Sequence, residues 1–175
     1  QRQMCIRDRC VPATLKVVDI AGLVKGASEG EGLGNQFLSH IREVQAIAHV
    51  VRCFEDENIA HVTGKPSALD DLEIVETELI LADLSQLERK LERLSKQMKG
   101  KSAKDSSPDA NETAVFQKMH DHLASGKMAS SLELSEEEEK TLQELQLLTA
   151  KPFFYVANLD EAELENPGPQ FQALE

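Results

Sequence analysis

The sequence predicts an α/β fold, in which a small parallel sheet carries an inserted helical hairpin. Three observations predict it. Three short apolar runs are typical of buried strands, and two of them end on the polar residues Asp19 and Asn158. Apolar residues at helical spacing lie between the first two runs. A long leucine-rich stretch, also at helical spacing, separates the second run from the third.

The elements before the leucine-rich stretch form a strand–loop–helix–strand unit. Residues 14–19 (TLKVVD) are β-branched and apolar and predict a strand, which a glycine-rich loop over residues 22–34 follows. Residues 35–47 predict a helix, and residues 49–54 (HVVRCF) predict a second strand. The apolar positions of the helix are Phe37, Leu38, Ile41, Val44 and Ile47. Such units build parallel sheets.

The leucine-rich stretch predicts the insertion. Residues 69–98 carry an apolar stripe in two segments with a phase slip between them, as in a coiled coil that changes register. The stripe comprises Leu72, Val75, Leu79 and Ala82, then Leu87, Leu91, Leu94 and Met98. Residues 100–111 predict a loop tip, and residues 112–124 predict a second helix. Its inward positions are Val115, Phe116, Met119 and Leu123.

A third helix and a third strand complete the predicted elements. Ser135 and Glu138 have the spacing of a capping box, and the acidic run 136–139 suits a helix N-terminus. The apolar face of this helix comprises Leu142, Leu145 and Leu148. Pro152 ends the helix, and residues 153–158 (FFYVAN) predict a third buried strand.

The composition and net charge of the chain argue against some classes of protein. The chain has 175 residues, of which 41% are apolar and 29% charged, and a net charge of -12. An acidic chain is a poor partner for free DNA, although a local basic patch stays open. No apolar run approaches the roughly 20 residues that span a membrane. The three cysteines lack metal-ligand spacing, so Cys53 is expected as a small buried side chain in a reduced, cytoplasmic protein.

Asp19 and Asn158 are the candidate site residues. Ligands of open α/β sheets bind at the carboxyl ends of strands, where both residues are expected. A carboxylate at Asp19 could hold Mg²⁺, directly or through water, beside phosphate oxygens. Gly22 leaves its N–H open to a terminal phosphate, and the glycine-rich loop could order around that phosphate as a switch. The alternative is that Asp19 only caps a turn.

The longer pattern is far more specific than these residues alone. The stretch VVDIAGLVKGASEGEGLGNQFL, with IRE, AIAHVVRCFED, NIAHVTGK and LTAKPFFYVANLDE after it, closely resembles the YchF / Obg-like ATPase family of P-loop NTPases. The likeness covers nearly all of residues 11–167 and about half of a full family member. It implies a P-loop NTPase sheet with a coiled-coil hairpin inserted.

The resemblance also implies roles for site residues. Asp19 and Gly22 match the switch II motif, and Asp19 is the expected Mg²⁺ ligand. Related GTPases carry a glutamine after the switch glycine to orient the attacking water, whereas Leu23 occupies that place here. The family's proposed substitute is a histidine in a mobile segment, which matches His61. On the sequence alone, a lone histidine such as His61 after a strand is more often an ordinary loop residue.

The turn NLDE matches the base-recognition position. GTPases carry N-K-x-D there, and Leu159 and Glu161 replace the lysine and the aspartate. The longer Glu161 misplaces the acceptor pair for guanine, and backbone groups around Leu159 could meet adenine instead. Asn158, Leu159 and Glu161 are therefore the expected nucleotide-binding residues, with ATP preferred over GTP. Without the resemblance, the same turn could simply cap a helix.

The sequence contains no G-x-x-x-x-G-K-[ST] motif. The GKS at residues 100–102 follows a predicted helix, and Ser95 stands where the first glycine belongs. We therefore expect an internal fragment. Its expected parts are a non-native leader (1–10), the central part of the nucleotide-binding domain (11–66), the hairpin (67–150) and a truncated strand with the base-recognition turn (151–175).

These observations predict a fragment of a cytoplasmic, ribosome-associated, Mg²⁺-dependent nucleotide hydrolase, nearly inactive by itself. The alternative is a non-catalytic coiled-coil interaction module, and an Obg-type GTPase is disfavoured by Leu159 and Glu161. The expected partners are the ribosome, at its large subunit, and nucleotide. A basic cluster toward the hairpin tip could touch rRNA, or its residues could pair locally with Glu88 and Glu92. The cluster comprises Lys90, Arg93, Lys96, Lys99, Lys101 and Lys104.

Overall fold

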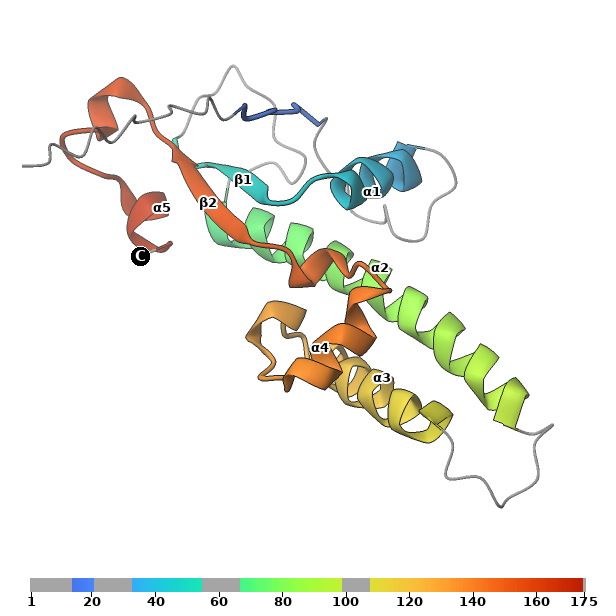
Figure 1. Ribbon diagram of the computed structural model, residues 1–175. Coiled ribbons are helices and arrows are strands. Elements are labelled where there is room, and N and C mark those ends of the chain that lie inside the picture. Colours follow the sequence, from blue (N-terminus) through green and yellow to red (C-terminus); the bar gives the residue numbers. More distant parts are fainter. Residues whose placement is uncertain (1–13, 21–32, 55–66, 99–107, 175) are drawn as a thin grey trace, which may run out of the picture.

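The computed structural model describes residues 14–20, 33–54, 67–98 and 108–174, which form two strands and a series of helices, most of them between the strands (Figure 1). The predicted α/β class with a small parallel sheet is confirmed. The elements are α1 (Leu33–Glu43), β1 (Ile47–Arg52), α2 (Ala68–Met98), α3 (Pro108–Ala124), η1 (Ala129–Ser131), α4 (Glu136–Gln143), η2 (Leu148–Ala150), β2 (Phe153–Asn158), η3 (Glu161–Glu163) and α5 (Pro169–Gln172).

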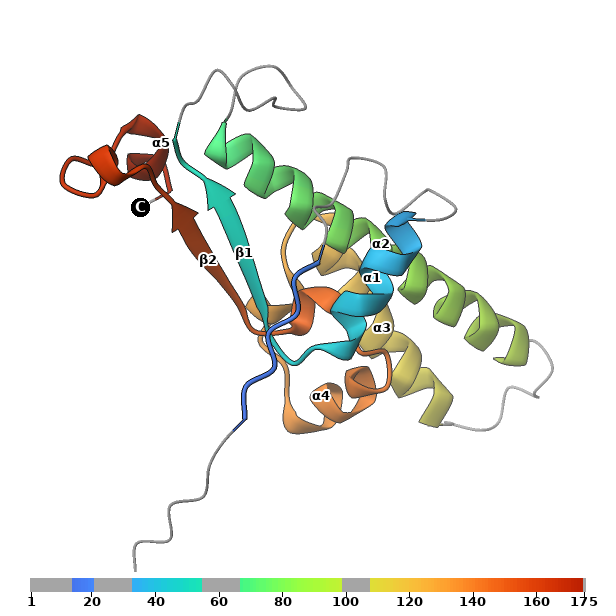
Figure 2. The ribbon, with the colours of Figure 1, turned by 90° about the horizontal axis from the view of Figure 1, so that it is seen from above.

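The sheet of the described residues consists of β1 and β2, which pair in parallel from Ile47 opposite Phe153 to Arg52 opposite Asn158. The bounds of β2 are those predicted. Its burial was predicted wrongly, because Phe154 and Val156 are exposed along with their neighbour Val50 on β1. Parallel strands are buried on both faces only where helices cover both, and α2 lies along one face of this sheet (Figures 1 and 2).

The predicted strand over residues 14–19 is wrong. Residues 14–20 are described and contain no strand, and Leu15 and Val17 are 87% and 84% exposed. A strand needs ladder hydrogen bonds to a neighbour, and β1 and β2 pair only with each other among the described residues. Only Ile20 is drawn inward, where it packs against a cluster that also contacts Ile47 and Phe153.

The two segments of the apolar stripe on α2 pack in two different clusters. Leu79 and Ala82 in the first segment pack in a cluster with α1, η2 and the beginnings of the strands. Leu87 and Leu94 in the second pack in a different cluster, with Phe116 and other residues of α3 and with the segment around α4. The phase slip therefore marks the point where α2 leaves the sheet and joins α3, which lies alongside it in the opposite direction (Figure 2).

The helices after α2 follow the predicted pattern with shifted ends. α3 begins at Pro108, within the stretch predicted as loop, and buries Phe116, Met119 and Leu123 as expected. α1 ends at Glu43, so Ile47 begins β1 instead of closing the helix. The coiled-coil character of the hairpin stays a prediction.

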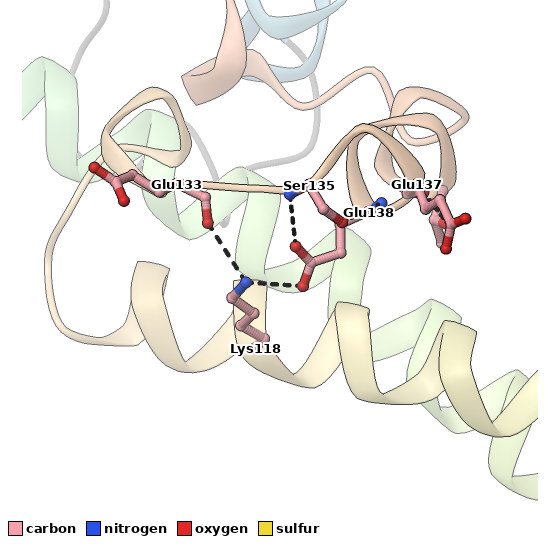
Figure 3. Close-up of polar contacts among 6 residues, drawn as sticks. Lys118, Glu133, Ser135, Glu137 and Glu138 are labelled. Carbon is pink, nitrogen blue, oxygen red and sulfur yellow. Dashed lines mark hydrogen bonds and ion pairs between the residues drawn. The ribbon is translucent and has the colours of Figure 1, made fainter.

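The predicted capping box at the start of α4 is confirmed (Figure 3). The Glu138 backbone N–H donates to the Ser135 hydroxyl at 3.3 Å, and the Ser135 N–H donates to the Glu138 carboxylate at 2.8 Å. Lys118 on α3 binds the same carboxylate at 2.8 Å and the Glu133 carbonyl oxygen at 3.4 Å. The cap thus also attaches α4 to α3. The bond from Lys118 lowers the pKa of Glu138.

Two side chains join the helices to β2. The Asp83 carboxylate, buried on α2, accepts from the backbone N–H groups of Leu148 and Thr149 and from the Thr149 hydroxyl, at 3.0, 2.8 and 2.7 Å. Burial raises the pKa of Asp83, although these bonds oppose the shift. Lys151 donates to the carbonyl oxygens of Arg42 and Val44 at 2.9 and 2.6 Å, which caps the C-terminal end of α1. Asp83 thus connects the segment just before β2 to α2, and Lys151 connects it to the end of α1.

Candidate functional site

The carboxyl end of β2 carries the predicted base-recognition turn. The carbonyl oxygen of Asn158 accepts from the Cys53 N–H at 2.9 Å, which continues the parallel pairing one residue beyond β1. The side chain of Asn158 is exposed. Asn158 therefore stands at the edge of the sheet where open α/β folds bind ligands.

Leu159 turns inward from this edge. It is half-buried and packs against a cluster of Val51, Cys53 and Ala68. Cys53 is a free, buried cysteine, as predicted, and burial raises the pKa of its thiol. Leu159 therefore anchors the turn in the place where the related GTPase motif has a lysine.

Glu161 opens the short 3-10 helix η3 and is exposed. The turn closes behind it, because the Glu163 N–H donates to the Asp160 carbonyl oxygen at 3.0 Å and the Asp160 N–H donates to the Glu163 carboxylate at 3.4 Å. Glu161 lies outside these bonds. Its carboxylate is available to a ligand at the end of β2, and the turn also satisfies its own backbone.

The C-terminal residues pack against this edge of the sheet. Phe171 packs against the same cluster as Leu159. Gln170 on α5 accepts from the Ala68 N–H at 3.0 Å, and the Ser67 hydroxyl accepts from the Asp70 N–H at 3.3 Å. These bonds satisfy two of the N–H groups at the start of α2. The start of α2, α5 and the turn after β2 thus form one packed unit.

Asp19 is not brought to this edge. Its neighbour Ile20 packs against the cluster that contacts Ile47 and Phe153, which are the first residues of β1 and β2. Asn158 is the last residue of β2. The expectation that Asp19 ends a strand is therefore wrong, whereas the same expectation for Asn158 is confirmed. Asp19 itself is exposed.

Three predicted site residues, Gly22, Leu23 and His61, lie outside the described residues. The same holds for Lys99, Lys101 and Lys104 of the basic cluster. Of the described members, Lys90 contacts Glu112 at 2.9 Å, and Lys96 contacts Glu92 at 2.7 Å. The predicted local pairing with Glu92 is confirmed for Lys96.

The described part of the chain contains no group of three or more His, Cys, Asp or Glu side chains arranged for a metal ion. A caged metal therefore does not fit these residues. Mg²⁺ in nucleotide enzymes needs only one or two carboxylates, with phosphate oxygens and water completing its shell. The exposed carboxylate of Asp19 fits that limited requirement. None of the described helices is long and apolar enough to cross a bilayer.

The sequence interpretation missed two groups of residues. Asp83 interrupts the apolar stripe of α2 at the phase slip, and a lone carboxylate within a stripe is a signal that could have identified it. His49, Glu76 and Tyr155 gather between the sheet and α2, where the Tyr155 hydroxyl donates to Glu76 and the rings of His49 and Tyr155 lie 6.2 Å apart. Only the alternation along the strands could have placed His49 and Tyr155 on one face.

Comparisons with known proteins agree with this architecture. A family model described as "50S ribosome-binding GTPase" matches residues 4–102. The chain is 51% identical over 158 residues to "Ribosome-binding ATPase YchF" of Escherichia coli O157:H7, and 49% identical over 159 residues to the protein of that name from Bacillus subtilis (strain 168). These alignments cover 90% and 91% of the chain.

A solved structure shows the same relationship in three dimensions. The Schizosaccharomyces pombe YchF GTPase matches with a TM-score of 0.76 and 37% sequence identity, over 94% of this chain and 44% of that one. The chain spans 42% of the length of the two bacterial relatives. The chain therefore belongs to the 50S ribosome-binding GTPase family, and the relatives that it resembles over about nine-tenths of its length are YchF proteins.

Proposed function

We propose that this chain supplies the switch and base-recognition parts of a Mg²⁺-dependent nucleoside triphosphate hydrolase that acts with the ribosome. The observation that carries the proposal is the turn at the end of β2. Asn158 and Glu161 are exposed there, beyond the last pair of a parallel sheet, while Leu159 packs beneath them. This is the position where α/β folds bind nucleotides.

The chemistry of the turn favours ATP over GTP. Guanine-specific sites place a short carboxylate against the two donors of guanine and a lysine stem along the ring. Glu161 is one methylene longer than that carboxylate, and Leu159 faces the protein cluster. Adenine needs one acceptor and one donor, which the backbone groups of Leu159, outside the bonds that close the turn, could supply. The relatives' names include both ATPase and GTPase, so the preference needs a direct measurement.

The switch residues extend this proposal toward hydrolysis. Asp19 would hold Mg²⁺ directly or through water, and the ion would neutralise charge on the phosphates. Because Ile20 packs at the opposite end of the sheet from Asn158, residues 14–19 must change position when nucleotide binds. Gly22 would admit the terminal phosphate. Leu23 cannot orient water, so His61 would take that part.

The ribosome is the proposed partner because the matched family and the bacterial relatives carry it in their names. The family description points to the large subunit. The described part of the basic cluster gives this contact limited support, because Lys90 and Lys96 already pair with carboxylates. Cosedimentation with separated ribosomal subunits tests the partner.

The test of the hydrolase uses the chain joined to the segments that flank the matched region in the Escherichia coli relative. We expect Mg²⁺-dependent turnover of ATP that falls at least about tenfold in Asp19→Asn and in His61→Ala. Asp121→Asn, an exposed change on α3, is the matched control and should leave turnover unchanged.

The outcomes separate the competing functions. Turnover that Asp19→Asn abolishes supports the hydrolase, and unchanged turnover in His61→Ala removes that histidine from the mechanism. A chimera that folds and binds ribosomes but neither binds nor hydrolyses nucleotide would instead support the non-catalytic interaction module.

A further inference from the structure

A hollow of about 360 Å³ lies where α1, α2 and the segment after α4 meet, away from the turn at the end of β2. Leu38 and Arg42 line it from α1, and Gln86 and Arg89 line it from α2. Leu145 completes the wall from the segment after α4. The lining therefore combines two guanidinium groups with buried leucines.

The two arginines are held by hydrogen bonds that fix their direction. Gln86 donates from its amide to the Leu145 carbonyl oxygen at 2.5 Å, which leaves its own amide oxygen to accept from Arg42 at 3.2 Å. Arg89 donates from Nε to the carbonyl oxygen of Ser85, one turn earlier on α2, at 3.0 Å. Each guanidinium group is thus bonded to a residue that also lines the hollow, Arg42 to Gln86 and Arg89 to Ser85.

Both arginines are exposed, and few of their donors are used within the protein. Within the described ranges, neither Arg42 nor Arg89 forms an ion pair, and only one guanidinium N–H of each donates a hydrogen bond. Asp83 acts on Arg42 only through longer-range attraction. Glu144 also lines the hollow, but its carboxylate lies 3.8 Å from the Lys90 ammonium.

The chemistry of the lining defines what can bind. A guanidinium group presents N–H donors in a planar fork, which matches the paired oxygens of a carboxylate or a phosphate. Leu38 and Leu145 are largely buried and add apolar side chains to the wall of the same hollow. We propose that the hollow binds a small amphipathic oxyanion, in which a carboxylate or a phosphate monoester is attached to an apolar body. This site is independent of the proposed nucleotide site.

The test is a chemical-shift titration of the isotope-labelled chain with benzoate and, separately, with phenyl phosphate at constant ionic strength. We expect saturable shifts at the backbone amides of Leu38, Gln86 and Leu145 with at least one probe. The probe that binds more tightly shows whether the hollow prefers a carboxylate or a phosphate. Benzamide, which has the same ring but no charge, should cause no saturable shift.

Two variants tie the binding to the guanidinium fork. Arg89→Gln should lower the affinity for the more tightly bound probe by about tenfold or more, because it removes charged hydrogen bonds. Arg93→Gln, an exposed change one turn further along α2, should leave the affinity unchanged. Circular dichroism verifies that both variants are folded.

Three results would overturn the proposal. They are shifts that stay linear with both charged probes, benzamide binding as tightly as benzoate, and equal losses of affinity in Arg89→Gln and Arg93→Gln.

Discussion

The buried carboxylate of Asp83 accepts hydrogen bonds from both the backbone N–H and the hydroxyl of Thr149, at 2.8 and 2.7 Å. Asp83 lies on α2 at the point where that helix leaves the sheet, and Thr149 lies in η2, just before β2. The contact therefore fixes the helical hairpin to the strand that carries the base-recognition turn. A substitution of Asp83 should therefore lower the free energy of unfolding of the whole chain.

Replacing Asp83 with alanine should lower the free energy of unfolding by about 3 kcal/mol, because three buried donors lose their acceptor. Asp83→Asn keeps one acceptor oxygen and should cost less. Urea unfolding followed by circular dichroism measures both. Glu73→Gln, an exposed change on the same helix, is the control and should cost less than about 0.5 kcal/mol. Equal losses in Asp83→Ala and Glu73→Gln would contradict the structural role of Asp83.

The phenol of Tyr155 should ionise at unusually high pH. Burial, followed by the hydrogen bond to Glu76 and the charge of Glu76, raises the pKa of Tyr155 to about 12. Because it is the only tyrosine and the chain has no tryptophan, its phenolate absorbance can be followed alone. Glu76→Gln should move the midpoint toward the ordinary value of about 10, whereas Glu73→Gln should not.

The same shift predicts how stability depends on pH. A raised folded-state pKa means that the folded protein retains the Tyr155 proton when the unfolded chain has lost it. The contribution is therefore fully present below about pH 10, the ordinary tyrosine value. It is lost as the pH rises toward about 12, the pKa of Tyr155 in the folded chain. Stability in Glu76→Gln should decline less over this interval, and an identical decline in the two proteins would count against the Tyr155–Glu76 contact.

Some elements could be predicted from the sequence because their signals are local. The capping box at Ser135 depends on two residues three positions apart, and the bounds of β2 depend on an apolar run between Pro152 and Leu159. The slip in the α2 stripe also lies within one helix. In each case neighbouring residues contain the whole pattern, so no distant contact was needed to identify it.

Other features depend on contacts between distant segments, which periodicity does not encode. Residues 14–19 have the composition of a strand but lack a pairing neighbour among the described residues. β2 was predicted as buried, although which helices cover its faces is a tertiary property. Asp83 depends on acceptor geometry across 66 residues of sequence. The position of β2 was predicted correctly, whereas the strand that was expected to end at Asp19 was not found.

Ser135→Ala should destabilise the chain by about 1 kcal/mol, since the Glu138 N–H at the start of α4 loses its acceptor. Thermal unfolding by circular dichroism measures the change. Ser130→Ala, an exposed serine in the preceding η1, is the matched control. If Ser130→Ala lowers stability as much as Ser135→Ala, the capping box does not stabilise α4 in solution.

Lys151→Met should loosen the end of α1 while retaining the apolar stem of the side chain. The carbonyl oxygens of Arg42 and Val44 would lose their donor, at a cost of about 1 kcal/mol. Hydrogen exchange should accelerate in the last turn of α1 and stay unchanged in α3. Lys140→Met, at an exposed position of α4, serves as the control. Unchanged exchange in α1 would show that Lys151 does not hold this helix.

The most direct test of the central claim, that the turn after β2 recognises the base and has lost guanine selectivity, is the ratio of ATP to GTP affinity. It is measured by calorimetry on the chain joined to the flanking segments of the Escherichia coli relative. We predict that ATP binds at least as tightly as GTP, and that the double change Leu159→Lys with Glu161→Asp shifts the ratio toward GTP by about tenfold or more. A clear preference for GTP before any change, or a ratio that the double change leaves untouched, would contradict the account.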